Sequence, residues 1–132
     1  MRYIISIAGS LIALFLLRVA VSTIKPVVFH PFWHDKAHLI GAGIGVAIVV
    51  FLYVVEKYKA SIFKMLSYLI FAGMIISLSI AWYYADIFVN SANFEASAGK
   101  NWYVSYHVFL AMFVPVIALI IRRFIPASDA NS

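Results

Sequence analysis

The sequence predicts an all-α integral membrane protein, an antiparallel bundle of four transmembrane helices. Of the 132 residues, 65% are hydrophobic and only 11% are charged, whereas roughly 25% of the residues of an ordinary soluble domain are charged. The mean hydropathy is +1.01. A short soluble domain buries only about 60–70% of the surface of its unfolded chain, so it could not hide this much apolar surface. The composition therefore excludes a soluble enzyme, a disordered protein and a nucleic-acid-binding protein.

Four apolar stretches are long enough to cross a bilayer, which takes about 20 residues of helix. They run from about Tyr3 to Ile24, from Ala37 to Val55, from Met65 to Ala85 and from Tyr103 to Ile121. The connections between them are short, so we expect neighbouring helices to be antiparallel in one membrane domain, residues 1–132. The first stretch also has the pattern of a secretory signal peptide, whose cleavage would leave three spans.

Basic residues indicate how the bundle is oriented. The second connection, residues 56–64, contains three lysines, and Arg2 and the pair Arg122–Arg123 flank the outermost spans. In a four-span protein these segments share one side. Positively charged residues favour the cytoplasmic side, so we expect a cell-membrane protein with both termini in the cytoplasm. An interfacial belt of aromatic residues is then expected at the outer side: Trp33, Trp82, Tyr83, Tyr84, Trp102 and Tyr103.

Ionisable residues gather near the outer ends of the predicted spans. Such groups are costly in a membrane and are therefore the first candidates for function. In chain order they are Arg18, His30, His34, Asp35, Lys36, His38, Asp86 and His107. The cytoplasmic half of the bundle, by contrast, is expected to have almost no polar side chain.

The spacing of the histidines suggests a metal site. If the second helix begins at Pro31, His34 and His38 lie four residues apart on one face, so that two imidazoles can converge on one ion. His107 and Asp86 enter from other helices at similar depth. Histidine and aspartate without cysteine suit copper(II), zinc or a non-haem metal. Two alternatives remain: haem b with His38 and His107 as axial ligands, and histidines that are solvated or hydrogen-bonded within the bundle.

Arg18 should not face lipid, because its charge lies about six residues below the outer end of the first span. It can extend to the outer head groups. Alternatively, it can form an ion pair inside the bundle with Asp86 or with Asp35.

Small residues mark one face of the second helix. Ala37, Gly41 and Gly45 recur at four-residue spacing, a pattern that lets another helix approach closely. The partner can be a helix of this chain or of another subunit. Pro115, in the middle of the fourth span, should kink that helix and free the carbonyl of Ala111.

Two family resemblances bear on function. The segment His34-Asp35-Lys36-Ala37-His38-Leu39 resembles part of the VanZ-like membrane proteins, although His38 comes one residue early and the family's later acidic and amide segments are absent. The chain is also similar in character to the small accessory membrane subunits of copper membrane monooxygenases, especially archaeal ammonia monooxygenase. That resemblance rests on size, four spans, the lack of cysteine and the outer cluster His30, His34, His38, Asp86 and His107.

The resemblance to accessory subunits implies a structural role beside catalytic subunits that hold the copper, with no catalytic residue in this chain. We therefore expect a small non-catalytic subunit of a larger membrane enzyme complex, of oxygenase or respiratory type, that contacts the lipid bilayer and other membrane subunits. The alternatives are an autonomous metal- or haem-binding redox protein that uses the outer histidines, and a VanZ-like envelope or resistance protein.

Overall fold

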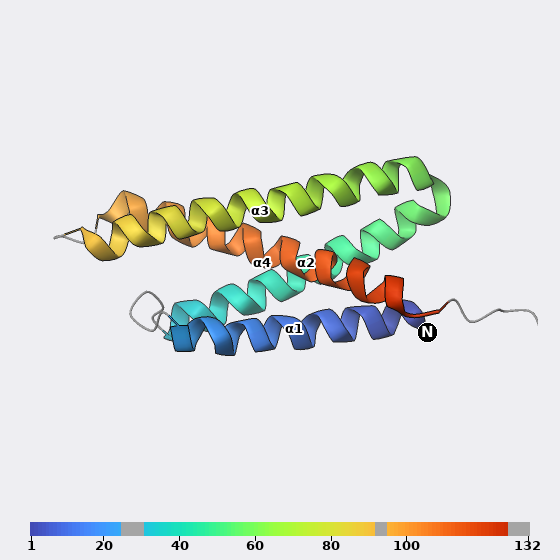
Figure 1. Cartoon of the computed structure of the whole chain (residues 1–132), viewed down its shortest axis with the longest axis horizontal. Helices are drawn as coiled ribbons and strands as arrows, with labels where there is room; N and C mark the ends of the chain where they lie inside the picture. The colour runs from blue at the N-terminus through green and yellow to red at the C-terminus, as the bar shows by residue number, and fades with distance from the viewer. Residues whose placement is uncertain (25–30, 92–94, 127–132) are drawn as a thin grey trace, which may run out of the picture.

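A computed structural model of the protein contains four long helices, α1 (Arg2–Ile24), α2 (Pro31–Tyr58), α3 (Ala60–Asn90) and α4 (Ala96–Phe124) (Figure 1). The structure describes residues 1–24, 31–91 and 95–126. Each helix is long and apolar enough to cross a membrane. The predicted fold class, an all-α bundle of four transmembrane helices, is thus confirmed, and the chain is a multi-pass membrane protein in a lipid environment.

The helices extend beyond the apolar stretches that the sequence marks as spans. The junction of α2 and α3 differs most, because Lys59 is the one residue between the two helices where a connection over 56–64 was expected. The Lys59 amide donates to the Val55 carbonyl at 2.8 Å, and the Lys59 carbonyl accepts from the Phe63 amide at 3.1 Å. A helix satisfies its own backbone hydrogen bonds, so it continues past the charged residues at which the apolar pattern ends.

The central element of the bundle is α4, which packs against each of the other three helices. Within the described residues, α1 and α3 do not contact each other. In Figure 1, α1 runs along one edge and α3 along the opposite edge, with α2 and α4 between them. More residues are buried on the central helix than at the edge. Three α3 residues are buried, and nine α4 residues are buried: Ala98, Tyr106, Phe109, Leu110, Ala111, Val114, Pro115, Val116 and Ala118.

The small-residue face of α2 lies against α4 of the same chain. Ala37 is only 1% exposed. A Cβ atom on Gly41 would come within 2.6 Å of the Leu110 Cβ, and one on Gly45 within 2.6 Å of the Val114 Cβ. Glycine is needed at these two positions because the helices approach more closely than any side chain would allow.

Pro115 lies inside α4, and the helix continues on both sides of it. Proline cannot donate a backbone hydrogen bond to the fourth preceding carbonyl, which is that of Ala111. This oxygen faces α2, where a Cβ on Gly45 would come within 3.1 Å of it. The freed carbonyl is therefore covered by the contact between α2 and α4.

The bundle has two ends with different chemistry. At the loop end, on the left in Figure 1, α1 and α3 finish and α2 and α4 begin. At the terminal end, on the right, lie the start of α1, the junction of α2 and α3 and the last turns of α4.

Candidate functional site

Two histidines and a tyrosine form a buried polar cluster at the loop end. His34 and His38 lie on α2, Tyr106 lies on α4, and their exposed fractions are 4%, 6% and 4%. The two imidazole rings stand edge to face with centroids 4.4 Å apart. The Tyr106 hydroxyl lies 3.3 Å from Nε2 of His34 and 3.4 Å from Nε2 of His38.

The hydrogen bonds assign the donors in this cluster. Nδ1 of His38 lies 2.9 Å from the His34 carbonyl, and a carbonyl only accepts, so Nδ1 carries the proton. In the neutral imidazole, Nε2 of His38 is then an acceptor for the Tyr106 hydroxyl. The Tyr106 oxygen in turn accepts from Nε2 of His34. These bonds form a closed ring that joins α2 to α4.

Aromatic side chains surround the cluster. The Trp102 ring stacks on the Tyr106 ring with centroids 6.2 Å apart and an interplanar angle of 18°. The stack continues to Phe88 on α3, whose ring centroid lies 6.5 Å from that of Trp102. Hydrogen bonds in such apolar surroundings are stronger than in water, so the cluster stabilises the packing of α2 against α4.

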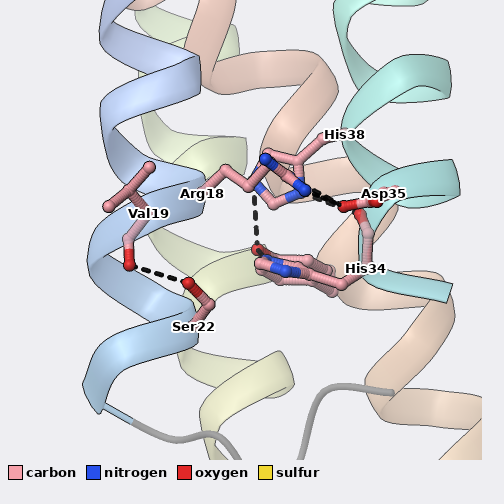
Figure 2. A network of polar contacts seen from close by, with 7 residues as sticks. Arg18, Val19, Ser22, His34, Asp35 and His38 are labelled. Atoms are coloured by element: carbon pink, nitrogen blue, oxygen red, sulfur yellow. Dashed lines mark hydrogen bonds and ion pairs between the residues drawn. The ribbon is translucent and has the colours of Figure 1, made fainter. Parts of the chain in front are cut away.

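Arg18 reaches from α1 to α2 beside this cluster (Figure 2). Its Nε donates to Oδ1 of Asp35 at 2.7 Å, and its Nη2 lies 2.6 Å from the same oxygen. The pair is well exposed, with 39% of the Arg18 side chain and 54% of the Asp35 side chain accessible.

The structure thus pairs Arg18 with Asp35, one of the two partners that the sequence allowed. Asp86, the other candidate and the one placed in the predicted bundle ion pair, accepts a hydrogen bond from Asn90 at 3.1 Å. The reason is topological: Asp86 lies on α3 and Arg18 on α1, and these helices occupy opposite edges of the bundle.

The structure does not bring the four predicted metal ligands together. His34 and His38 meet, but no group of three His, Asp or Glu side chains within the described residues is arranged to hold an ion. His107 follows Tyr106 by one residue, about 100° around the helix, and its Nδ1 lies 2.8 Å from the Tyr103 carbonyl. The same difference in position around α4 explains why Tyr106, and not His107, lies against His38. His38 and His107 are the two predicted haem ligands. His30 falls outside the described residues.

A second polar cluster, which the sequence did not predict, lies at the terminal end. Glu56 on α2 accepts two hydrogen bonds from Arg122 on α4 in a bidentate ion pair. The guanidinium carbon lies 5.1–5.5 Å from three ring centroids, those of Tyr3, Tyr53 and Phe63. The ion pair is less exposed than that of Arg18, with accessible fractions of 14% for Arg122 and 24% for Glu56.

Hydroxyl groups extend this second cluster onto α1. The Ser6 hydroxyl donates to the Tyr3 carbonyl at 2.8 Å, so in its 2.7 Å bond with the Tyr53 hydroxyl it is the acceptor. Ser6 and Ser10 are fully buried. The expectation that this half of the bundle has almost no polar side chain was therefore wrong. The hydropathy pattern places Glu56 in a connection and Arg122 in the tail, although Tyr3, Ser6 and Ser10 follow a helical spacing of three and four residues.

Comparisons of the chain with protein-family models, curated proteins and solved structures find no match. The resemblances to monooxygenase accessory subunits and to VanZ-like proteins remain predictions.

Proposed function

We propose that the chain is a small non-catalytic subunit of a larger membrane enzyme complex, of oxygenase or respiratory type, and that it packs against its partners through α3. The observation that carries this proposal is the poor coverage of α3 within the chain. Of its 31 residues, only Ser77, Ala81 and Ala85 are buried.

The residue types on α3 favour a protein neighbour over lipid alone. Ala72, Ile76 and Ser79 lie on one exposed face in the middle of the helix, and the Ser79 hydroxyl donates to the Ile75 carbonyl of its own helix at 2.9 Å. Small and hydroxyl residues let a second membrane helix approach closely. Large apolar side chains are exposed on both sides of this face, among them Ile75, Leu78 and Ile80, and they are exposed on α1 as well, among them Leu11, Phe15 and Leu16.

The polar side chains support a structural role. In the part of the chain that the structure describes, every buried side-chain nitrogen or oxygen has a hydrogen-bond partner. His34, His38 and Tyr106 bond to one another, and Arg122 bonds to Glu56. Satisfied groups of this kind hold helices together.

Site-specific photo-crosslinking in native membranes tests the proposal. A photoreactive amino acid at Ile76 on α3 has a matched control at Phe15 on α1, because both residues are 58% exposed. We expect the Ile76 probe to give one adduct of fixed mass that co-purifies at constant stoichiometry, and the Phe15 probe to give none. Lipid adducts alone at both positions, with a monodisperse single chain in mild detergent, would contradict the proposal.

We further propose that both termini face the cytoplasm of a cell membrane. Its support is the concentration of basic residues at the terminal end: Arg2, Lys57, Lys59, Lys64, Arg122 and Arg123. Such residues favour the cytoplasmic side. Because the chain has no cysteine, Lys57→Cys and Lys100→Cys variants report topology without background. A membrane-impermeant maleimide should label Lys100→Cys in intact cells and Lys57→Cys only after permeabilisation; the reverse pattern would invert the topology.

An autonomous redox protein is the second candidate, and the convergence of His34 and His38 favours it. An ion held by both Nε2 atoms would have to displace the Tyr106 hydroxyl or take it as a ligand. Elemental analysis and a visible spectrum of the purified chain decide between the two roles. Stoichiometric copper, or a Soret band lost in His38→Ala and His107→Ala variants, would favour the redox role; the subunit role predicts neither.

A further inference from the structure

A groove of about 320 Å³ lies between α3 and α4 at the terminal end of the bundle. Its walls combine apolar side chains, among them Phe71, Val116 and Ile120, with the cationic side chains of Lys64 and Arg123. It lies at the opposite end of the bundle from the histidine cluster, and its α3 residues, within 63–71, directly precede the exposed stretch with Ala72, Ile76 and Ser79 that is proposed as a subunit contact.

The polarity of the groove changes along the helix axes. On α3, Phe71 lies seven residues from Lys64, and on α4, Val116 lies seven residues from Arg123, which is about 10 Å along each helix. The two helices are antiparallel neighbours, so both apolar residues lie toward the middle of the bundle and both cations toward its end. A phospholipid has the same gradient, from acyl chain to phosphate.

Within residues 1–24, 31–91 and 95–126, no carboxylate pairs with the two cations at the end of the groove. Arg122 also lines the groove, but its guanidinium is bound to Glu56. Lys64 and Arg123 are exposed, and neither forms an ion pair within the described residues. Two cations without an ion-pair partner among the described residues therefore lie at the end of the apolar groove, where an anion can approach both.

We propose that this groove binds an anionic phospholipid of the surrounding bilayer. Its phosphate pairs with Lys64 and Arg123, and its first acyl carbons lie against Phe71, Val116 and Ile120. The volume is at the lower end of the range of about 300–1,000 Å³ found for small-molecule pockets, which suits a head group and the adjoining carbons. Basic pockets between transmembrane helices recognise anionic head groups in this way.

Native mass spectrometry of the full chain tests the site. The chain is reconstituted in vesicles of phosphatidylcholine and phosphatidylglycerol in a 4:1 ratio, extracted in mild detergent, and scored for retained lipid. We expect one phosphatidylglycerol to be retained in preference to phosphatidylcholine. Each Lys or Arg near an anionic head group contributes about fivefold in affinity, so Lys64→Ala with Arg123→Ala should weaken retention by about thirtyfold.

A second pair of variants separates the groove from general surface charge. Lys57→Ala with Lys59→Ala removes the same charge at the same end, but neither residue lines the groove. This control should retain phosphatidylglycerol as the wild type does. Ile120→Trp leaves all charges in place, fills the apolar part and should also reduce retention; inorganic phosphate, a free anion without acyl chains, should not compete.

The proposal is overturned by equal loss in the two double variants, by equal retention of the neutral and the anionic lipid, or by unchanged retention in Lys64→Ala with Arg123→Ala. Competition by inorganic phosphate would assign the cations to a free anion and likewise reject the lipid. Lys64 and Arg123 are exposed, so the melting temperature in detergent should not change in their variants, and the single substitutions serve if the double variant fails to fold.

Discussion

The two ends of the bundle are held together by different chemistry. At the loop end, the buried polar side chains are those of His34, His38 and Tyr106, which hydrogen-bond to one another as neutral groups. The ion pair of Arg18 lies beside them and is exposed. At the terminal end the ion pair itself is sheltered, with Arg122 bound to Glu56.

The difference in burial decides how much each ion pair contributes. A carboxylate and a guanidinium in water lose little when separated, but a charge left without its partner in a sheltered position is costly. Rings from α1, α2 and α3 surround Arg122, so its pair connects all four helices. The pair between Arg18 and Asp35 connects only α1 and α2.

The largest effect is expected at the terminal end. Glu56→Ala leaves the Arg122 guanidinium among aromatic rings without its carboxylate, which should lower the free energy of unfolding by about 2–3 kcal/mol, somewhat less than for a fully buried pair. Reversible unfolding in detergent measures this loss. A double-mutant cycle with Arg122→Ala should give a larger coupling energy than the same cycle on Arg18 and Asp35. Equal coupling energies would contradict the expectation that the sheltered ion pair contributes more to stability than the exposed one.

The next largest effect is expected where α2 and α4 meet between the ends. Gly41→Ala and Gly45→Ala each place a Cβ within 2.6 Å of a side-chain carbon of α4, and overpacking of this kind costs about 1–3 kcal/mol. Gly43 on the same helix has no neighbouring atom within 4 Å, so Gly43→Ala should be neutral or slightly stabilising. Comparison of the three melting temperatures checks this; a similar loss for all three would contradict the close contact.

A smaller effect is expected at the loop end. Tyr106→Phe removes the hydroxyl that His34 and His38 share, and we expect a loss of about 1–2 kcal/mol because buried partners are left unsatisfied. Tyr83→Phe is the control, since residue Tyr83 is 62% exposed. Unfolding in detergent should show the loss for Tyr106→Phe alone. An unchanged stability would show that the hydroxyl does not hold the two helices together.

The smallest effect is expected for Arg18→Leu. Its partner Asp35 is more than half exposed, and ion pairs in such positions contribute about 0.2–1 kcal/mol. Salt screens exposed charges, so the difference between this variant and the wild type should shrink in high salt, whereas that of Glu56→Ala should persist. A loss as large as that of Glu56→Ala would indicate that the bilayer shelters the pair of Arg18.

The sequence predicted the histidine cluster in part and the terminal cluster not at all. The spacing of four residues between His34 and His38 was enough to bring the two rings to one face. Their partner Tyr106 was not identified, because the rotation of α4 about its axis decides whether residue 106 or His107 faces α2. Glu56 and Arg122 are 66 residues apart, and nothing local in the sequence relates them.

By itself, the sequence determined that this protein crosses a membrane on four helices, because so many apolar residues in runs of this length have no other stable environment. It also determined the small face of α2, since close approach requires glycine. Only the tertiary structure decided the partners: α4 for that face, Asp35 for Arg18, Glu56 for Arg122. The physical reason is that hydropathy specifies which segments lie in lipid, whereas the order of helices across the bundle, with α1 and α3 at opposite edges, specifies which charges can meet.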